Sequence, residues 1–537
     1  MKAHLKYRIV KIFHSLLFVG LLFSCAQRSA LTGGDKDILP PEIKSTLPEN
    51  QTLNFNSKEI VVEFNEFIRL SNLQNQLIVS PLMDEKPEVM IKGKKMVVKL
   101  SAELAENTTY SLNFGDAIID ITENNPYPNY KYVFSTGDYI DSLSYAGKVL
   151  NAEDLTPKAN VFVMLYSQLE DSIPIKQKPN YLAKTKVDGT FTITNVAKGK
   201  YKVFALDDIN GNYLYDLPNE QLAFLNEPIE LDTNASEATL YLFTKESITQ
   251  FVKKIENKQY GKLTVEFNIP TTALELLDLD EKPYPVLAKE SNKNNTQHTL
   301  WLNQEITENK QVFIVKDNGK IIDTSKVEML PTSEFKDTLL SLKSNVTSLF
   351  DLNQKIVFTA NQPISTFQKD KISLFEDSLL VNFKLENDSL SALNINLIYP
   401  FKAHANYKLL VEPETFSSIY QLKNDTLKSV FKTRNEEDYG NLKFTITPNF
   451  SERYMVQLLQ KNEVIEEFFA INTKTFNVAY LKPGEYQIKL IVDSNANKKW
   501  DSGNYQLNLQ PEKVIFYQEK IIIRENWDNE IQWNIKL

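Results

Sequence analysis

Cysteine, histidine and glycine are scarce in this chain of 537 residues, which contains 1 Cys, 4 His and 15 Gly. A single cysteine excludes intramolecular disulfides, so hydrophobic cores must stabilise the fold. His4 and His14 lie in the N-terminal segment 1–24. His298, in the polar stretch NKNNTQHTL, and His404 stand alone, so no Cys/His set has zinc-ligand spacing. Because G-x-S-x-G and glycine-rich phosphate motifs are also missing, we predict that the protein is not an enzyme.

An excess of basic residues is missing as well. The chain has 60 Lys and Arg against 69 Asp and Glu, a formal net charge of −9. No basic stripe stands out along the sequence, and nucleic acid needs such a surface for binding. We therefore expect no nucleic-acid partner.

Residues that favour β-strands are abundant. The chain contains 31 Phe and 24 Tyr, and short β-branched or aromatic runs such as EIVVEFNEFI and TYSLNF alternate with turn segments rich in Pro, Asn and Asp. This pattern predicts an all-β fold of tandem β-sandwich domains in an extended array. A helix is considered for one segment, TTALELLDLDEK at residues 271–282.

The N-terminus has the pattern of a secretory signal. The basic stretch MKAHLKYRIVK precedes the apolar run IFHSLLFVGLLF, which is short for a membrane span. LFSC at residues 22–25 then resembles the lipobox of bacterial lipoproteins. The resemblance implies a signal peptide at 1–24, lipidation of Cys25 and a membrane anchor. The alternative is an ordinary secretory signal.

Residues 25–37 have the composition of a tether. TGGDKD, followed by Pro40 and Pro41, resembles the leader of a group of Bacteroidota lipoproteins. Position 26 is Ala rather than Asp, and no acidic pair follows Cys25. By that resemblance the outer membrane is favoured, with the periplasmic face preferred over the cell surface.

Two domain types are indicated by resemblance. Residues 38–138 carry Pro41, Pro48 and Tyr110 and end in YKYVFSTG, which resembles the Ig-like domain of S-layer-type bacterial proteins. Residues 139–244 resemble prealbumin-like or carboxypeptidase-regulatory-like domains. Within them, Asp188-Gly189 predicts a hairpin turn. Both resemblances imply β-sandwiches and no chemistry.

The layout of these domains recurs near the C-terminus. Phe191 to Gly199 is matched by Phe476 to Gly484, and Gly199 to Asp208 by Gly484 to Asp493, at identical offsets. KIVFTANQPIS and NYKLLVEPETF echo the first Ig-like unit more weakly. We expect a duplicated unit around a divergent centre. The predicted parts are the signal peptide (1–24), the tether (25–37), the Ig-like (38–138), prealbumin-like (139–244) and divergent β-domains (245–342), and the second Ig-like (343–435) and prealbumin-like domains (436–537).

A D-x-N-x-N-x3-D motif occurs in both prealbumin-like parts. Alternating oxygen side chains could bind calcium, but the Gly and Glu that an EF-hand loop requires at its sixth and twelfth positions are missing. Asx turns, which need no metal, explain the same residues and are favoured. The residues concerned are Asp208, Asn210, Asn212 and Asp216, and Asp493, Asn495, Asn497 and Asp501.

Asp-Ser/Thr followed by Leu or Ile occurs six times. This triplet resembles the O-glycosylation acceptor motif of Bacteroidota envelope proteins, and ordinary polar loops are the alternative. The hydroxyl residues are Ser142, Ser172, Thr338, Ser378, Ser389 and Thr426.

Three functions compete for such a chain. The favoured one is a non-catalytic, lipid-anchored envelope scaffold, an accessory subunit of an outer-membrane protein machine whose partner is an integral barrel. A glycan- or polymer-binding lipoprotein is the alternative, which the 4 Trp residues weaken. A hydrolase with a cryptic carboxylate site is the least favoured, because catalytic motifs are missing.

Overall fold

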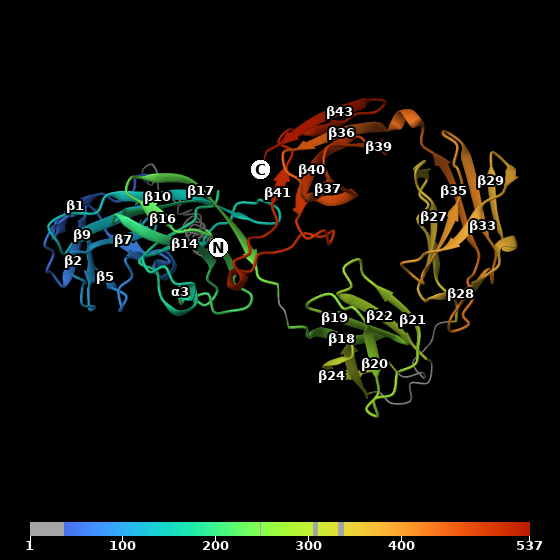
Figure 1. Cartoon of the computed structure of the whole chain (residues 1–537), viewed down its shortest axis with the longest axis horizontal. Helices are drawn as coiled ribbons and strands as arrows, with labels where there is room; N and C mark the ends of the chain where they lie inside the picture. Colours follow the sequence, from blue (N-terminus) through green and yellow to red (C-terminus); the bar gives the residue numbers. More distant parts are fainter. Residues whose placement is uncertain (1–36, 247–248, 304–309, 331–337, 537) are drawn as a thin grey trace, which may run out of the picture. The chain divides into compact units, whose positions relative to one another are not determined.

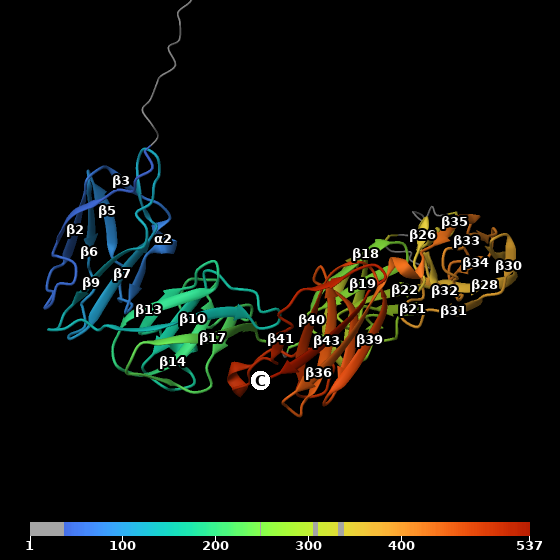
Figure 2. The same ribbon diagram turned by 90° about the horizontal axis from the view of Figure 1, so that it is seen from above.

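The computed structural model describes residues 37–246, 249–303, 310–330 and 338–536 (Figures 1 and 2). Strands dominate, and the described helices have only three or four residues each, so the predicted all-β fold of tandem sandwiches is confirmed. The signal, Cys25 and all but the last residue of the tether lie outside the described residues. The short helices are α2 (Leu73–Gln76), α3 (Ile173–Lys176), η3 (Lys369–Lys371), η4 (Glu436–Asp438) and η5 (Tyr505–Leu507).

Two compact units divide the chain. The first contains the residues up to Ser144 together with Asn180–Leu182 and Thr194–Lys198, and the second contains the remainder.

The first Ig-like sandwich packs two sheets face to face, ordered β1-β2-β6-β5 and β4-β7-β9. Alternate apolar side chains of both sheets, such as Val62 and Leu112, fill one core. Its strands are β1 (Ile43–Leu47), β2 (Glu59–Phe64), β3 (Ile68–Leu70), β4 (Ile78–Ser80), β5 (Glu88–Lys92), β6 (Lys95–Lys99), β7 (Thr109–Gly115), β8 (Ile118–Asp120) and β9 (Tyr130–Ser135).

A second sandwich repeats this plan with sheets β25-β27-β32-β31 and β26-β35-β33-β29-β30. Its core is formed by the same alternation. The strands are β25 (Leu342–Ser344), β26 (Leu349–Phe350), β27 (Ile356–Ala360), β28 (Ile364–Phe367), β29 (Ile372–Glu376), β30 (Leu379–Val381), β31 (Lys384–Asn387), β32 (Asn394–Ile398), β33 (Asn406–Val411), β34 (Phe416–Ser418) and β35 (Leu427–Thr433).

An aromatic pair at the centre of each sandwich shows how closely the two correspond. Tyr110 lies opposite Phe134 with stacked rings 5.4 Å apart, and Tyr407 lies opposite Phe431 with stacked rings 5.3 Å apart. Each tyrosine hydroxyl accepts a 2.9 Å hydrogen bond from the backbone N–H five residues earlier. The same residue types in the same register build both cores.

In residues 139–244, the part predicted to be prealbumin-like, the sheet has the order β12-β11-β14-β15-β17-β10-β13, with β16 on β14. The Asp188-Gly189 turn forms, with Gly189 at φ 78°, but it does not join paired strands as predicted, because β12 pairs with β11 and β13 with β10. The strands are β10 (Leu143–Asn151), β11 (Phe162–Tyr166), β12 (Tyr181–Lys184), β13 (Thr190–Val196), β14 (Gly199–Asp207), β15 (Gln221–Phe224), β16 (Ile229–Leu231) and β17 (Ala235–Thr244).

The C-terminal sheets repeat these pairings. Strand β40 pairs with β37, β41 and β42 as β14 pairs with β11, β15 and β16, and parallel β36-β43 corresponds to parallel β10-β17. The strands are β36 (Gly440–Pro448), β37 (Arg453–Gln460), β38 (Glu463–Ala470), β39 (Lys474–Leu481), β40 (Gly484–Asp493), β41 (Val514–Phe516), β42 (Ile521–Ile523) and β43 (Asp528–Ile535).

The central β-domain has sheets β18-β19-β22-β21 and β20-β23-β24. The helix considered for 271–282 is wrong, because β20 pairs with β23 and buries Leu276 and Leu277, so tertiary pairing overrides helix propensity. The strands are β18 (Val252–Gln259), β19 (Lys262–Phe267), β20 (Leu274–Leu277), β21 (Val286–Ser291), β22 (Gln297–Leu302), β23 (Lys310–Asp317) and β24 (Lys320–Glu328).

Candidate functional site: two polar loops

Both D-x-N-x-N-x3-D motifs lie in loops that leave equivalent strands. Asp208 follows the last residue of β14, and Asp493 is the last residue of β40. Leu206 pairs with Leu222 after the first loop, and Ile491 pairs with Val514 after the second. The strand pairing therefore places the two motifs at corresponding positions.

In the first loop the Asp208 carboxylate organises the turn. Its Oδ1 accepts hydrogen bonds from the backbone N–H groups of Gly211 (2.7 Å) and Asn212 (3.3 Å), and its Oδ2 from that of Tyr213 (2.8 Å). Asp216 accepts from the side-chain amides of Asn210 (3.1 Å) and Asn212 (2.7 Å). All four predicted residues thus belong to one network.

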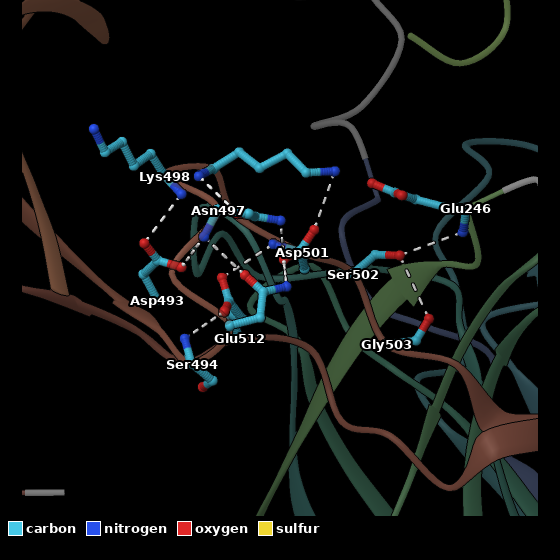
Figure 3. A network of polar contacts seen from close by, with 11 residues as sticks. Glu246, Asp493, Ser494, Asn497, Lys498, Asp501, Ser502, Gly503 and Glu512 are labelled. Carbon is cyan, nitrogen blue, oxygen red and sulfur yellow. Dashed lines mark hydrogen bonds and ion pairs between the residues drawn. The ribbon is translucent and has the colours of Figure 1, made fainter. Parts of the chain in front are cut away.

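The second loop repeats this network (Figure 3). Asp493 accepts from the backbone N–H groups of Asn497 (3.0 Å) and Lys498 (3.1 Å). Asp501 Oδ2 accepts from the amides of Asn495 (2.6 Å) and Asn497 (2.7 Å). The four residues predicted here are likewise brought together.

The loop backbones also match. Gly211 and Tyr213 have φ of 74° and 65°, and the corresponding Ala496 and Lys498 have φ of 62° and 64°. A non-glycine residue enters this left-handed region at a cost of about 1–2 kcal/mol. The carboxylate bonds to the backbone N–H groups of Tyr213 and Lys498 offset that cost.

A buried glutamate closes each loop, and sequence reasoning missed both. Glu220 has 0% exposure and accepts from the backbone N–H groups of Asp216 (3.1 Å) and Leu217 (3.0 Å). Glu512 accepts from those of Ser494 (2.7 Å) and Asp501 (3.2 Å). Burial, with Asp501 and Asp493 nearby, raises the pKa of Glu512. Each glutamate lies two residues before the strand residue that pairs back across its loop, Leu222 or Val514. This shared position could have revealed both glutamates, but the two loops differ in length, so the glutamates do not align when counted from the first aspartate.

These contacts fit the Asx-turn interpretation. Backbone and amide N–H groups satisfy the aspartate oxygens of both loops, so the networks need no cation. Among the described residues, no group of three or more His, Cys, Asp or Glu side chains is arranged to hold a metal ion. Calcium binding by these loops stays a prediction, tested below.

The longer second loop contacts strands β14 and β15 within the same compact unit. The Tyr505 ring lies 5.3 Å from the Phe204 ring and 5.0 Å from the Phe224 ring. Gln510 Nε2 donates to the Phe224 carbonyl oxygen at 3.0 Å. The extra residues of this loop therefore serve packing.

The two remaining histidines have structural surroundings. His298 lies in β22 rather than in a loop, is 2% exposed, and its ring nitrogens contact Thr271 Oγ1 (2.6 Å) and Ser291 Oγ (2.7 Å). Burial lowers its pKa, helped by Lys289. His404 is exposed and contacts Lys432 Nζ at 3.1 Å.

The glycosylation candidates are spread over the chain. The acceptors Ser142, Thr338, Ser378, Ser389 and Thr426 are exposed, and Ser172 is half-buried. Exposed hydroxyl groups are expected both for glycosylated residues and for ordinary polar loops, so O-glycosylation at this motif stays a prediction. No helix in the described part of the chain is long and apolar enough to cross a membrane.

Comparison with known proteins identifies one domain. Residues 37–136 match the model of the bacterial Ig-like domain, which covers the first sandwich. No curated protein matches the chain.

Solved structures resemble the chain at low identity. The major pilin subunit of Bacillus cereus is 8% identical, with 73% of this chain and 99% of that chain covered and a TM-score of 0.13. The S-layer protein rSbsC is 10% identical, with 90% and 67% covered and a TM-score of 0.14. The BSP domain of a biofilm-associated protein is 9% identical, with 76% and 99% covered and a TM-score of 0.16. At these scores the likenesses carry no functional argument.

Proposed function

We propose that this protein is a non-catalytic, lipid-anchored component of the cell envelope whose β-sandwiches act as a binding scaffold. The observation that carries the proposal is the bacterial Ig-like domain at residues 37–136, followed by further β-sandwich domains. The buried polar groups of the two loops support it: Glu220, Asp493 and Glu512 accept hydrogen bonds from loop backbone. These hydrogen bonds stabilise the shape of the loops, which is a structural role.

The proposed location is the periplasmic face of the outer membrane, with Cys25 as the acylated residue. The proposed partner is an integral outer-membrane barrel, to which this chain would be an accessory subunit. Glycan binding has less support, because Trp527, 58% exposed, stands alone: Trp301 is buried, and Trp500 and Trp533 are half-buried.

Substitution of Cys25, the proposed anchor residue, tests the proposed membrane location. Cys25→Ser should abolish acylation and release the protein from membranes. Mass spectrometry of the N-terminal peptide and flotation of the outer membrane would measure this. A Ser variant that still carries lipid and floats with the outer membrane would refute the anchor. Co-purification of a barrel with the wild type in mild detergent would test the partner.

A further inference from the structure

A basic and apolar surface lies on the outer side of the second Ig-like sandwich. Lys428, Val430 and Lys432 alternate along β35, the strand labelled in Figure 1. Because alternate residues of a strand point to the same side, their side chains share one face of the sheet. Lys408 on β33 lies opposite Val430, and Phe375 on β29 pairs with both Lys408 and Leu380. We call Lys408, Lys428, Val430, Lys432 and Leu380 the basic face.

Neither the charge nor the apolar area of the basic face is covered. Val430 is 74% exposed and Leu380 is 68% exposed. In the described part of the chain none of the three lysines pairs with a carboxylate, and Lys432 contacts only His404. In the first sandwich, by contrast, the Lys95 ammonium on β6 pairs with the Glu63 carboxylate at 3.1 Å. Uncovered apolar side chains within unbalanced charge are typical of an interaction surface.

The corresponding face of the first sandwich is already a protein interface. Ser111 pairs with Val133 as Lys408 pairs with Val430, so the two valines are equivalent. Val133 is only 8% exposed. Within the first compact unit, Lys131 donates to Thr194 Oγ1 and to Asn195 Oδ1 (2.7 Å). Because polypeptide covers this face in one copy, polypeptide is the favoured occupant in the other.

A surface of opposite charge lies at one end of the first sandwich. The backbone N–H of Ile121 donates to the Phe67 carbonyl oxygen, and the side-chain amide of Asn125 donates to the Leu39 carbonyl oxygen. The chain segments that carry the exposed apolar residues Leu39, Phe67 and Ile121 are therefore neighbours. Burial and the negative charges of Asp120, Asp37 and Glu123 raise the pKa of Glu66, a sign of excess negative charge there. We call this set the acidic patch: Asp37, Ile38 (78% exposed), Leu39 (68%), Glu66, Phe67 (57%), Ile121 (53%) and Glu123.

We propose that the basic face of one molecule binds the acidic patch of a second copy of this chain. Each surface combines exposed large apolar side chains with an excess of one charge: the basic face has three lysines, and the acidic patch has three carboxylates against one cation, Lys94, which lies 5.4 Å from the centroid of the Phe67 ring. The two excess charges have opposite signs, so contact would bury apolar area and pair the charges. The two surfaces differ, so the contact is heterologous, and each added molecule leaves one surface of each kind free. Association therefore proceeds head to tail and weakens as salt concentration rises.

Sedimentation of a soluble form that begins at Ala26 tests this proposal and contains every described residue. It lacks Cys25, so failure of the lipid-anchor proposal would not affect the result. The wild type should gain mass with concentration. Lys408→Glu/Lys428→Glu should raise the dissociation constant by at least about tenfold. The control Lys343→Glu/Lys355→Glu makes the same charge change at two exposed residues, one on β25 of the opposite sheet and one directly before its strand β27, and should leave association unchanged.

Reversal on the other side completes the experiment. Asp37→Lys/Glu123→Lys should weaken self-association as strongly as the Lys408/Lys428 reversal. A mixture of the two variants should associate more strongly than either variant alone, because the intact acidic patch of one can bind the intact basic face of the other, and the two reversed surfaces also have opposite charges. A chain with both reversals should associate again, since its charges are exchanged. This restoration also shows that the substitutions did not unfold the chain.

Three outcomes would overturn the proposal. The wild type could remain monomeric at every concentration. It could associate equally well with the Lys408/Lys428 reversal, which would place the contact elsewhere. It could bind phosphatidylglycerol vesicles through the basic face without self-association, which would assign that face to lipid.

Discussion

Val133 and Val430 occupy the same position in two copies of one sandwich, yet their exposures are 8% and 74%. Both lie before a core phenylalanine, Phe134 or Phe431, which is buried in each copy. The inward side of the strand is therefore the same in both copies, while the outward side depends on what covers it. The comparison separates residues that build the sandwich from residues that determine its contacts.

The shared core gives the largest expected effect. Phe134→Ala and Phe431→Ala should each lower the free energy of unfolding of their sandwich by about 3–5 kcal/mol, because each removes a buried ring stacked on a tyrosine. Denaturant unfolding followed by fluorescence would measure both losses. A cost below about 1 kcal/mol in one copy only would show that the cores are not equivalent.

The outward valines should respond differently. Val133→Ala should cost up to about 1.5–3 kcal/mol, the value of a buried valine side chain. Val430→Ala should stay within about 0.5 kcal/mol, as is usual for surface substitutions. Equal losses at the two positions, measured by the same unfolding assay, would contradict the difference in cover.

Glu512 offers a smaller effect that depends on pH. Its raised pKa means that its contribution to stability is fully present below its unfolded pKa and is lost as pH rises through its folded pKa. The melting temperature of the wild type minus that of Glu512→Gln should therefore fall as pH rises from acid toward neutrality. Thermal melts across that range would measure it. A difference that grows with pH would contradict the cause assigned to the shift.

The polar loops should give the smallest response. Because backbone and amide N–H groups satisfy Asp208 and Asp216, millimolar calcium should leave the melting temperature equal to that in chelator. Asp208→Ala should still cost on the order of 1 kcal/mol through its lost hydrogen bonds. A rise in melting temperature with calcium that Asp208→Ala abolishes would establish a metal site and refute the Asx-turn interpretation.

Local sequence predicted the β-sandwiches and both D-x-N-x-N-x3-D networks, because strand alternation and Asx turns depend on residues that are close together in the sequence. It did not predict Glu220 and Glu512, which close their loops from 12 and 19 residues beyond the first aspartate. It also could not separate YKYVFST from LKSVFKT, since the contacts of Lys131, which lies on the same face of β9 as Val133, come from Thr194 and Asn195, more than 60 residues along the chain. Nor did it reveal the basic face, because only strand pairing brings Lys408 on β33 and Leu380 on β30 to the same face as Lys428, Val430 and Lys432 on β35.

Thiol accessibility tests the central claim, that one face is covered in the first sandwich and bare in the second. Replacement of Cys25, the one cysteine, leaves a background free of thiols. Val133→Cys and Val430→Cys can then be labelled with a maleimide under native conditions at low protein concentration. The account predicts that Cys at position 430 reacts as fast as a free thiol and that Cys at position 133 reacts at least about a hundredfold more slowly, since reaction there requires local opening. Equal rates at the two positions would contradict it.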